Sequence, residues 1–315
     1  MTSAILVVRL GAMGDVIHTL PAVVSLKQSF PNWRLVWVID PRWAPLLEGN
    51  PFVDKVIVFD RKNWSSMRML WRSLRSESFH VALDFQGLIK SALVAKLARA
   101  EKTIGYGFSQ LREPAAALFY SLTFRSQARH IVDRHLELAA YVGARRIEPM
   151  FPLPSGSPEG HLPEGGYVLA SPFAGWPAKE WPLANYVQLA RLLRQRWGLP
   201  LVLNTHPSGA SKLAQLEGTV LHVSSLAGLI DATRRARAVV GVDSGPLHLA
   251  AALGKPGVAI FGPTDPERNG PYGRSMVILR SSKAQTSYQR KQSYDDSMRA
   301  ISAEQVADAL APQLG

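Results

Sequence analysis

Asp15 lies where an apolar segment ends and an amphipathic helix is expected to begin. The apolar residues 4–9 are typical of a buried strand, and the expected helix covers residues 16–30. Two interpretations of Asp15 stay open. An Asp at a helix start commonly acts as an N-cap for backbone N–H groups and needs no further role. A carboxylate at the end of a strand, kept ionised by the helix dipole, is also suited to take a proton from an attacking hydroxyl group. His18, one turn farther on, is either the competing base or a satisfied polar neighbour.

A second strand-to-helix junction joins Asp243, Ser244 and Gly245 to a helix that carries His248. Proline at position 246 suits a first helical turn, and glycine permits a ligand to approach the backbone closely. Because N–H groups at a helix N-terminus bind anions, the junction predicts a pyrophosphate site. An ordinary strand-to-helix connection, with a histidine at the edge of the core, would account for the same residues.

Lys179 lies in a third junction, between Gly175 and the next expected helix. A lysine in this place is suited to neutralise the charge of a leaving diphosphate, with Ala174 and Gly175 beside it. A solvated loop lysine is the alternative interpretation. Residues 261–266 form a rigid turn after a further strand.

Apolar strands alternate with helical segments along the chain, which is the order of parallel sheets covered by helices. The alternation is interrupted at 151–166, where 16 residues include four Pro and four Gly. The order predicts an α/β fold of two Rossmann-like, doubly wound domains, 1–155 and 156–315, which face a central cleft that receives the carboxyl ends of their strands. The capping-box spacing of Ser302 and Gln305 predicts a terminal helix, which could pack back on the first domain.

The first junction superficially resembles a dinucleotide-binding fingerprint. Arg9 occupies the place of the first glycine, however, and Asp15 would direct a carboxylate at the pyrophosphate. The sequence therefore disfavours a nicotinamide-dependent oxidoreductase.

The composition excludes several classes of protein. With 47% apolar residues and no cysteine, the chain has the profile of a folded protein without disulfides or thiolate metal sites. No segment approaches the ~20 apolar residues of a membrane-spanning helix, and the N-terminus lacks a signal-peptide pattern, which predicts a cytoplasmic protein. The net charge is +12, and residues 1–155 carry 20 Lys and Arg against 12 Asp and Glu. This basic excess suits an anionic substrate or membrane; nucleic acid is disfavoured, because no nucleic-acid-binding signature accompanies it.

Together these junctions match a known family in order and spacing. The chain resembles the ADP-heptose:lipopolysaccharide heptosyltransferases, which are glycosyltransferase family 9 and have the GT-B fold. The resemblance covers essentially the whole chain and is carried by residues 13–15 with 20–21, 179 with 181–182, 243–245 with 248, and 261–266. Further matches at 84–91, 112–114 and 134 resemble the heptosyltransferase I branch, which adds the first heptose to the Kdo-lipid A core.

The resemblance implies an inverting enzyme without metal or cofactor that moves heptose from ADP-heptose to Kdo-lipid A. It implies that Asp15 is the general base and that Lys179 stabilises the leaving diphosphate. The residues expected to bind the donor are Ala174, Gly175, Lys179, Asp243, Ser244, Gly245 and His248. The residues expected to meet the acceptor's carboxylates and phosphates are Arg61, Lys62, Lys90, Arg112 and Arg134.

Alternatives stay open at this point. Heptosyltransferase II or another core glycosyltransferase would share much of the same framework. A catalytically silent module that only binds nucleotide sugars would keep the donor residues.

A basic amphipathic segment lies at 62–75, with Trp64, Met67, Trp71 and Leu74 at helical spacing and three arginines largely off that stripe. Such a helix could make peripheral contact with an anionic inner membrane surface. A stripe of this kind more commonly packs on the core of its own domain.

Overall fold

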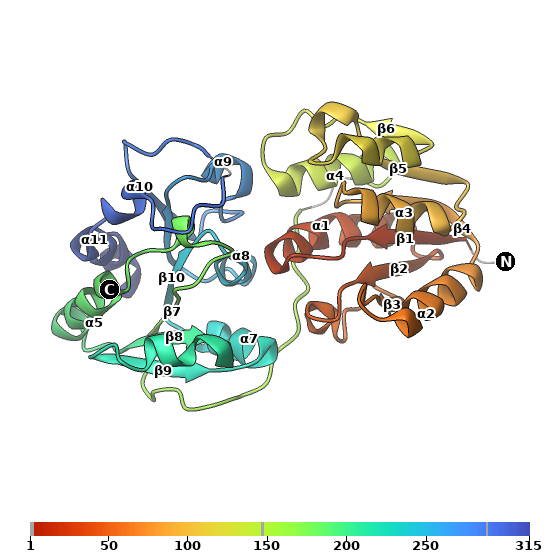
Figure 1. The fold of residues 1–315 in the computed structure, drawn as a ribbon. Coiled ribbons are helices and arrows are strands. Elements are labelled where there is room, and N and C mark those ends of the chain that lie inside the picture. The colour runs from red at the N-terminus through yellow and green to blue at the C-terminus, as the bar shows by residue number, and fades with distance from the viewer. Residues whose placement is uncertain (1–2, 146–147, 288) are drawn as a thin grey trace. The chain divides into compact units, whose positions relative to one another are not determined.

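The computed structural model describes residues 3–145, 148–287 and 289–315 (Figure 1). Contacts between residues divide the chain into two compact units, Met1–Pro154 and Ser155–Gly315. Each unit contains one six-stranded sheet in which every pair of neighbouring strands is parallel.

The first unit has the sheet order β3-β2-β1-β4-β5-β6. Its strands are β1 (Ala4–Val8), β2 (Arg34–Ile39), β3 (Lys55–Val58), β4 (Phe79–Asp84), β5 (Lys102–Tyr106) and β6 (Leu122–Phe124). Its helices are α1 (Met13–Ser29), η1 (Ala44–Leu47), α2 (Trp64–Arg75), α3 (Ile89–Leu97), η2 (Phe108–Gln110), η3 (Pro114–Phe119) and α4 (Ile131–Tyr141). The helices α2 and α3 pack on one face of the sheet in a common core, while α1 packs against α4.

The second unit has the sheet order β12-β11-β10-β7-β8-β9. Its strands are β7 (Val168–Ser171), β8 (Leu201–Thr205), β9 (Thr219–Val223), β10 (Ala238–Val242), β11 (Gly257–Phe261) and β12 (Met276–Arg280). Its helices are η4 (Pro177–Lys179), α5 (Leu183–Trp197), η5 (Pro207–Gly209), α6 (Ala210–Leu213), α7 (Leu226–Arg235), α8 (Gly245–Ala252), α9 (Pro266–Asn269), α10 (Asp296–Arg299) and α11 (Ala303–Leu314).

The two sheets share one topology. Numbered from its own first strand, the second sheet has the same strand order as the first, which is the order of the Rossmann fold. In this order the winding reverses between β1 and β4 in the first unit and between β7 and β10 in the second. Ligands of such sheets bind at the carboxyl ends of the strands beside the reversal. The α/β class with two doubly wound halves, expected from the alternation of elements, is confirmed.

The central strands are buried because helices cover both of their faces. All five residues of β1 are buried, as are all five of β10. Such strands read as continuous apolar runs rather than as alternating patterns, which explains why they stand out in the sequence. The helices cover the faces of the sheet but not the carboxyl ends of its strands, where the loops that carry polar residues begin.

The terminal helix α11 begins with the expected capping box. Ser302 Oγ accepts a hydrogen bond from the backbone N–H of Gln305 (3.2 Å), and Gln305 Oε1 accepts one from the N–H of Ser302 (2.9 Å). The helix packs against α5, and its Val306, Leu310 and Leu314 belong to the core of the second unit. The sequence left open that this helix packs on the first domain. In the structure its buried residues belong to the second unit.

No helix of the described residues has the length and hydropathy that crossing a bilayer requires.

Candidate functional site

Asp15 lies in the first turn of α1, the helix that follows β1. It is the third helical residue, and Asp15 Oδ2 accepts a hydrogen bond from the N–H of the N-cap residue Ala12 (3.0 Å). Asp15 is therefore not the N-cap residue itself. It lies inside the helix, and its carboxylate accepts the hydrogen bond from the N-cap residue Ala12. Its side chain is 44% exposed. A carboxylate oriented by the backbone yet open to solvent is available to a substrate.

Arg9 forms an ion pair with the same carboxylate from the buried side. Its side chain is buried, with Nη2 2.6 Å from Asp15 Oδ1, and Nη1 donates a hydrogen bond to the carbonyl oxygen of Phe85. The Arg9 carbonyl accepts a hydrogen bond from Trp37 Nε1 (3.1 Å). Sequence reasoning noted Arg9 only as a missing glycine. The signal that could have found it is an arginine at the end of a buried strand, where a guanidinium requires a partner.

His18 lies one turn after Asp15 and is buried. Its ring meets the ring of His130 edge to face, with 5.9 Å between centroids. Burial separates its surroundings from those of Asp15, whose carboxylate is exposed. Asp15 is thus the better placed of the two candidate bases.

Three predicted donor residues meet in the second unit. Lys179 Nζ lies 2.7 Å from Asp243 Oδ2, and His248 Nε2 lies 3.4 Å from Asp243 Oδ1. All three side chains are buried. They meet because β7 and β10 are parallel neighbours, so the loop after β7 and the junction after β10 emerge side by side. Lys179 Nζ also lies 4.3 Å from the centre of the Trp176 ring, which contacts the ammonium group on a second side.

The cluster stabilises the ionised form of Asp243. Burial alone would raise the pKa of this carboxyl group, but the hydrogen bond from His248 and the charge of Lys179 lower the pKa well below its usual range. Because the pKa is lower in the folded than in the unfolded chain, ionised Asp243 stabilises the fold above its unfolded pKa. That stabilisation is lost as the pH falls below about 4.

Asp243→Asn therefore predicts a pH-dependent loss of stability. At pH 7 the variant should unfold at lower urea concentration, with a free energy of unfolding reduced by about 3 kcal/mol, because Lys179 loses its buried partner. Below about pH 4 the difference between the two proteins should narrow steadily, because the carboxyl group of the unfolded chain is protonated first and that of folded Asp243 only at lower pH. Urea unfolding followed by tryptophan fluorescence between pH 7 and 3 measures both effects. Asp296→Asn, at a carboxylate 96% exposed, is the control; a constant gap at every pH would contradict the assignment.

The backbone beside this cluster suits a bound anion. The helix α8 begins at Gly245, directly after Ser244, so the N–H groups of its first turn point toward the end of β10. The buried Ser244 Oγ and Thr264 Oγ1 have no hydrogen-bond partner among the described residues. A helix N-terminus flanked by a lysine and unsatisfied hydroxyl groups is the arrangement that binds phosphate groups.

The remaining two predicted donor residues lie in the loop that leads to Lys179. The N–H of Ala174 donates a hydrogen bond to Glu180 Oε1 (3.1 Å), so this amide is engaged within its own loop. At Gly175 an added Cβ would meet no atom within 4 Å. Gly175 therefore borders open space, and no packing contact of its own accounts for the glycine.

The predicted acceptor residues fall into separate groups. Arg61 and Lys62 are exposed in the turn after β3, and Lys90 is half-buried on α3. Burial and the nearby charge of Arg61 lower the pKa of Lys90, so these two cations share one region. Arg112 is exposed between η2 and η3.

Arg134 lies elsewhere, buried on α4, with its guanidinium 5.1 Å from the centre of the Tyr106 ring. Tyr106 and His135 share a hydrogen bond of 2.6 Å (Oη to Nδ1). Burial and the charges of Arg9 and Arg134 lower the pKa of His135 well below its usual value. The charge of Arg134 thus acts on the same histidine as the charge of Arg9, which pairs with Asp15.

Asp84 ends β4, the strand beside β1, and is fully buried. Its Oδ1 accepts hydrogen bonds from the N–H groups of Gln86 and Gly87, and its Oδ2 accepts one from the hydroxyl of Tyr120 (2.7 Å). Burial raises the pKa of this carboxyl group. With its oxygens engaged in the fold, Asp84 shapes the turn that places Phe85 against Arg9.

No three His, Cys, Asp or Glu side chains within residues 3–145, 148–287 and 289–315 gather closely enough to hold a metal ion.

Comparison with known proteins assigns the family. The profile of glycosyltransferase family 9 (heptosyltransferase) matches residues 67–298. Lipopolysaccharide heptosyltransferase 1 of Pseudomonas aeruginosa is 32% identical over 88% of this chain and 83% of its own. The enzyme of the same name from Escherichia coli strain K12 is 30% identical over 88% of this chain and 93% of its own.

Solved structures agree. The Escherichia coli heptosyltransferase WaaC, solved with ADP, superposes with a TM-score of 0.80 at 25% identity, over 98% of this chain and 99% of its own. The same enzyme solved with ADP-2-deoxy-2-fluoro heptose gives a TM-score of 0.77. The match over almost the whole of both chains confirms the GT-B fold that the resemblance implied. The chain belongs to glycosyltransferase family 9, the heptosyltransferases.

Proposed function

We propose that the protein transfers heptose from ADP-heptose to the Kdo-lipid A inner core of lipopolysaccharide, in one inverting displacement that needs no metal ion. The observation that carries the proposal is the buried cluster of Lys179, Asp243 and His248 beside the N-terminus of α8. This cluster lies at the winding reversal of its sheet, where ligands of such folds bind. Relatives named for this reaction, and a related enzyme that binds ADP and a fluorinated ADP-heptose, support the same substrate class.

The donor's diphosphate would bind at this cluster. The Lys179 ammonium and the first-turn N–H groups of α8 supply positive charge where the leaving diphosphate develops negative charge. Asp243 has a different task, since a carboxylate would repel phosphate. It fixes the position of Lys179 and orients His248, and the Lys179 ammonium group keeps further N–H donors for the ligand.

The acceptor hydroxyl would meet Asp15. As the hydroxyl oxygen attacks the anomeric carbon, its proton passes to the Asp15 carboxylate and the bond from that carbon to the diphosphate oxygen breaks. Attack opposite the leaving group inverts the configuration. Arg9 acts as a positioning residue, because it fixes one carboxylate oxygen from a buried site.

The acceptor's anionic groups would meet the basic residues of the first unit. Arg61 and Lys90 share one region, and Arg134 lies near His135, which the charge of Arg9 also reaches. Guanidinium groups suit the carboxylates and phosphates of a lipopolysaccharide precursor. The enzyme would work in the cytoplasm, at the inner face of the membrane that holds this lipid-linked acceptor.

The decisive experiment offers ADP-heptose to the purified protein with Kdo-lipid A and, separately, with heptosyl-Kdo-lipid A, in the presence of EDTA. Transfer to Kdo-lipid A alone, undiminished by EDTA, is the expected result. Transfer only to heptosyl-Kdo-lipid A would assign the second heptose instead. Binding of ADP without transfer to either acceptor would indicate a silent binding module, and loss of activity in EDTA would contradict the metal-free mechanism.

A further inference from the structure

The helix α2 does not bury the apolar stripe that its sequence predicts. Its core-facing residues are Leu70 and Leu74, each 1% exposed. Trp64 is 86% exposed and Trp71 is 51% exposed, and Met67 is exposed as well. The interpretation that this stripe packs on the domain core is wrong for all of its members except Leu74. Packing on the core therefore does not explain why one helix carries two exposed tryptophans.

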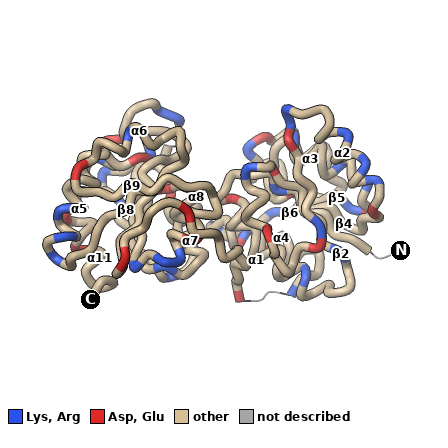
Figure 2. Tube along the Cα trace, turned by 90° about the horizontal axis from the view of Figure 1, so that it is seen from below, with Lys and Arg blue, Asp and Glu red and all other residues tan. Residues whose placement is uncertain are grey.

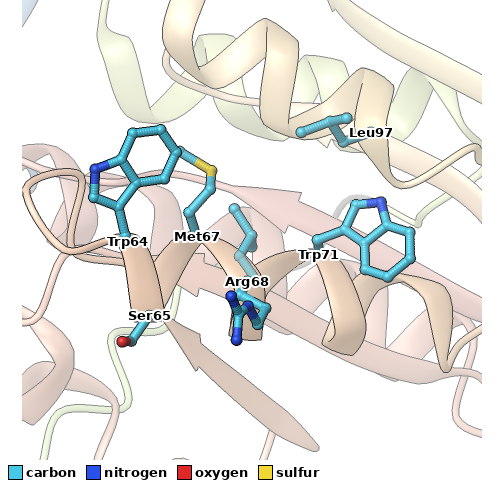
Figure 3. A pocket seen from close by; sticks show the side chains of 7 residues that line it. Trp64, Ser65, Met67, Arg68, Trp71 and Leu97 are labelled. Atoms are coloured by element: carbon cyan, nitrogen blue, oxygen red, sulfur yellow. The ribbon is translucent and has the colours of Figure 1, made fainter.

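A second row of exposed apolar side chains lies on α3, which shares a face of the sheet with α2. Ile89, Leu93 and Leu97 follow one another at intervals of four residues and are each 38–42% exposed. Leu97 and the α2 side chains line a common hollow of about 430 Å³. Figure 3 shows Trp64, Met67 and Trp71 on α2 with Leu97 on the facing helix. We call Trp64, Met67, Trp71, Ile89, Leu93 and Leu97 the α2–α3 apolar surface.

The charge around this surface has one sign. Residues 61–76 contain five Lys and Arg and no Asp or Glu, and residues 85–100 contain three Lys and Arg and no acidic residue. Arg68, Arg72 and Arg75 are exposed at successive turns of α2, whose basic positions Figure 2 draws in blue. The Arg75 guanidinium lies 5.6 Å from the centre of the Trp71 ring, so a cation and an apolar ring adjoin directly.

We propose that the α2–α3 apolar surface docks on an anionic phospholipid bilayer. Tryptophan prefers the boundary between headgroups and acyl chains, because its ring is apolar and its N–H is polar. Arginine stems extend along apolar surface while their guanidinium groups reach the phosphates. Each arginine near an anionic surface strengthens binding by about fivefold at physiological salt. The inference rests on the proposed function for its purpose, since docking brings the first unit to a lipid-linked acceptor.

Vesicle flotation of the full chain tests the surface directly. The protein should float with vesicles of phosphatidylcholine and phosphatidylglycerol, remain unbound with phosphatidylcholine alone, and release the anionic vesicles at high salt. Arg68→Ser/Arg72→Ser should weaken binding by about 20-fold, and Trp64→Ser/Trp71→Ser should weaken it at every salt concentration at which the unaltered protein still floats. The matched control is Arg191→Ser/Arg194→Ser, two exposed arginines on α5, which should bind as the unaltered protein does.

Activity separates this proposal from the proposed function. Both surface variants should transfer heptose to a deacylated, soluble acceptor with unchanged kcat and KM, and lose kcat/KM only with acceptor embedded in anionic vesicles. If the unaltered protein fails with the soluble acceptor, the proposed function is wrong whatever the vesicles show. Equal flotation of the variants and the unaltered protein would overturn the docking surface. So would a dimer in sedimentation that Trp64→Ser/Trp71→Ser dissociates, because the surface would then join two copies of the chain.

Discussion

Replacing Asp15 by Asn should lower kcat for heptose transfer by about 10²- to 10⁴-fold, the usual contribution of a general base. Asparagine keeps the size of the side chain and can still accept the hydrogen bond from the N–H of Ala12. It cannot accept a proton from the acceptor hydroxyl. Calorimetry should give an unchanged Kd for ADP, because the phosphate-binding residues belong to a different unit. Initial rates at saturating ADP-heptose measure the effect.

Asp308→Asn is the matched control for this variant. Asp308 also pairs with an arginine at 2.6 Å, through Arg196 Nη1, but this pair lies on the exposed faces of α11 and α5. Removing such a pair should change neither kcat nor stability appreciably. If Asp15→Asn retained more than a tenth of the kcat of the unaltered protein, as an order-of-magnitude limit, Asp15 would not be the base. His18→Gln would then be the next variant to assay.

Replacing Lys179 by Met should impair both catalysis and folding. The positive charge beside the leaving diphosphate disappears, which should lower kcat by about 10²- to 10³-fold and weaken ADP binding. Asp243, 5% exposed, keeps only His248 as a partner among the described residues, so the free energy of unfolding should fall by about 3 kcal/mol. Thermal unfolding with and without ADP, together with initial rates, measures the three effects.

Two further variants make the Lys179 result interpretable. Lys179→Arg keeps a positive charge beside Asp243 and should recover most of the stability, so it isolates the catalytic effect if Lys179→Met folds poorly. Lys255→Met is the control, since Lys255 is a partly buried lysine of the same unit that donates to the carbonyl of Arg234. Full activity in Lys179→Met would remove Lys179 from the proposed mechanism.

Long, fully covered elements were predictable from the sequence. The strand expected at 4–9 and the helix expected at 16–30 lie at Ala4–Val8 and Met13–Ser29 in the structure. No element was assigned between 99 and 150, where β5, β6 and α4 lie. The strand β6 has only three residues, too few for a pattern, and β5 contains Gly105. A Cβ at Gly105 would lie 2.3 Å from the ring of Tyr120, so packing requires the residue that weakens the strand signal.

Some residues of the candidate site were likewise predictable from the sequence, and others were not. Asp15, Lys179 and Asp243 were placed at strand ends by sequence order alone, because the carboxyl ends of parallel strands share one edge. The contacts of Arg9 were not predictable, since its partner carbonyl at Phe85 is 76 residues away in the chain. The sequence left open whether the stripe of α2 is buried or exposed, because Leu70 and Leu74 also satisfy helical spacing, and only the packed sheet selects between the two faces.

The place of α11 bears on which stop codons the gene tolerates. Val306, Leu310 and Leu314 of this helix lie in one core with β7 and β10. The loops that carry Lys179 and Asp243 extend from those two strands. A stop codon or frameshift ahead of the α11 codons would thus disable the predicted donor site, although it alters none of that site's residues.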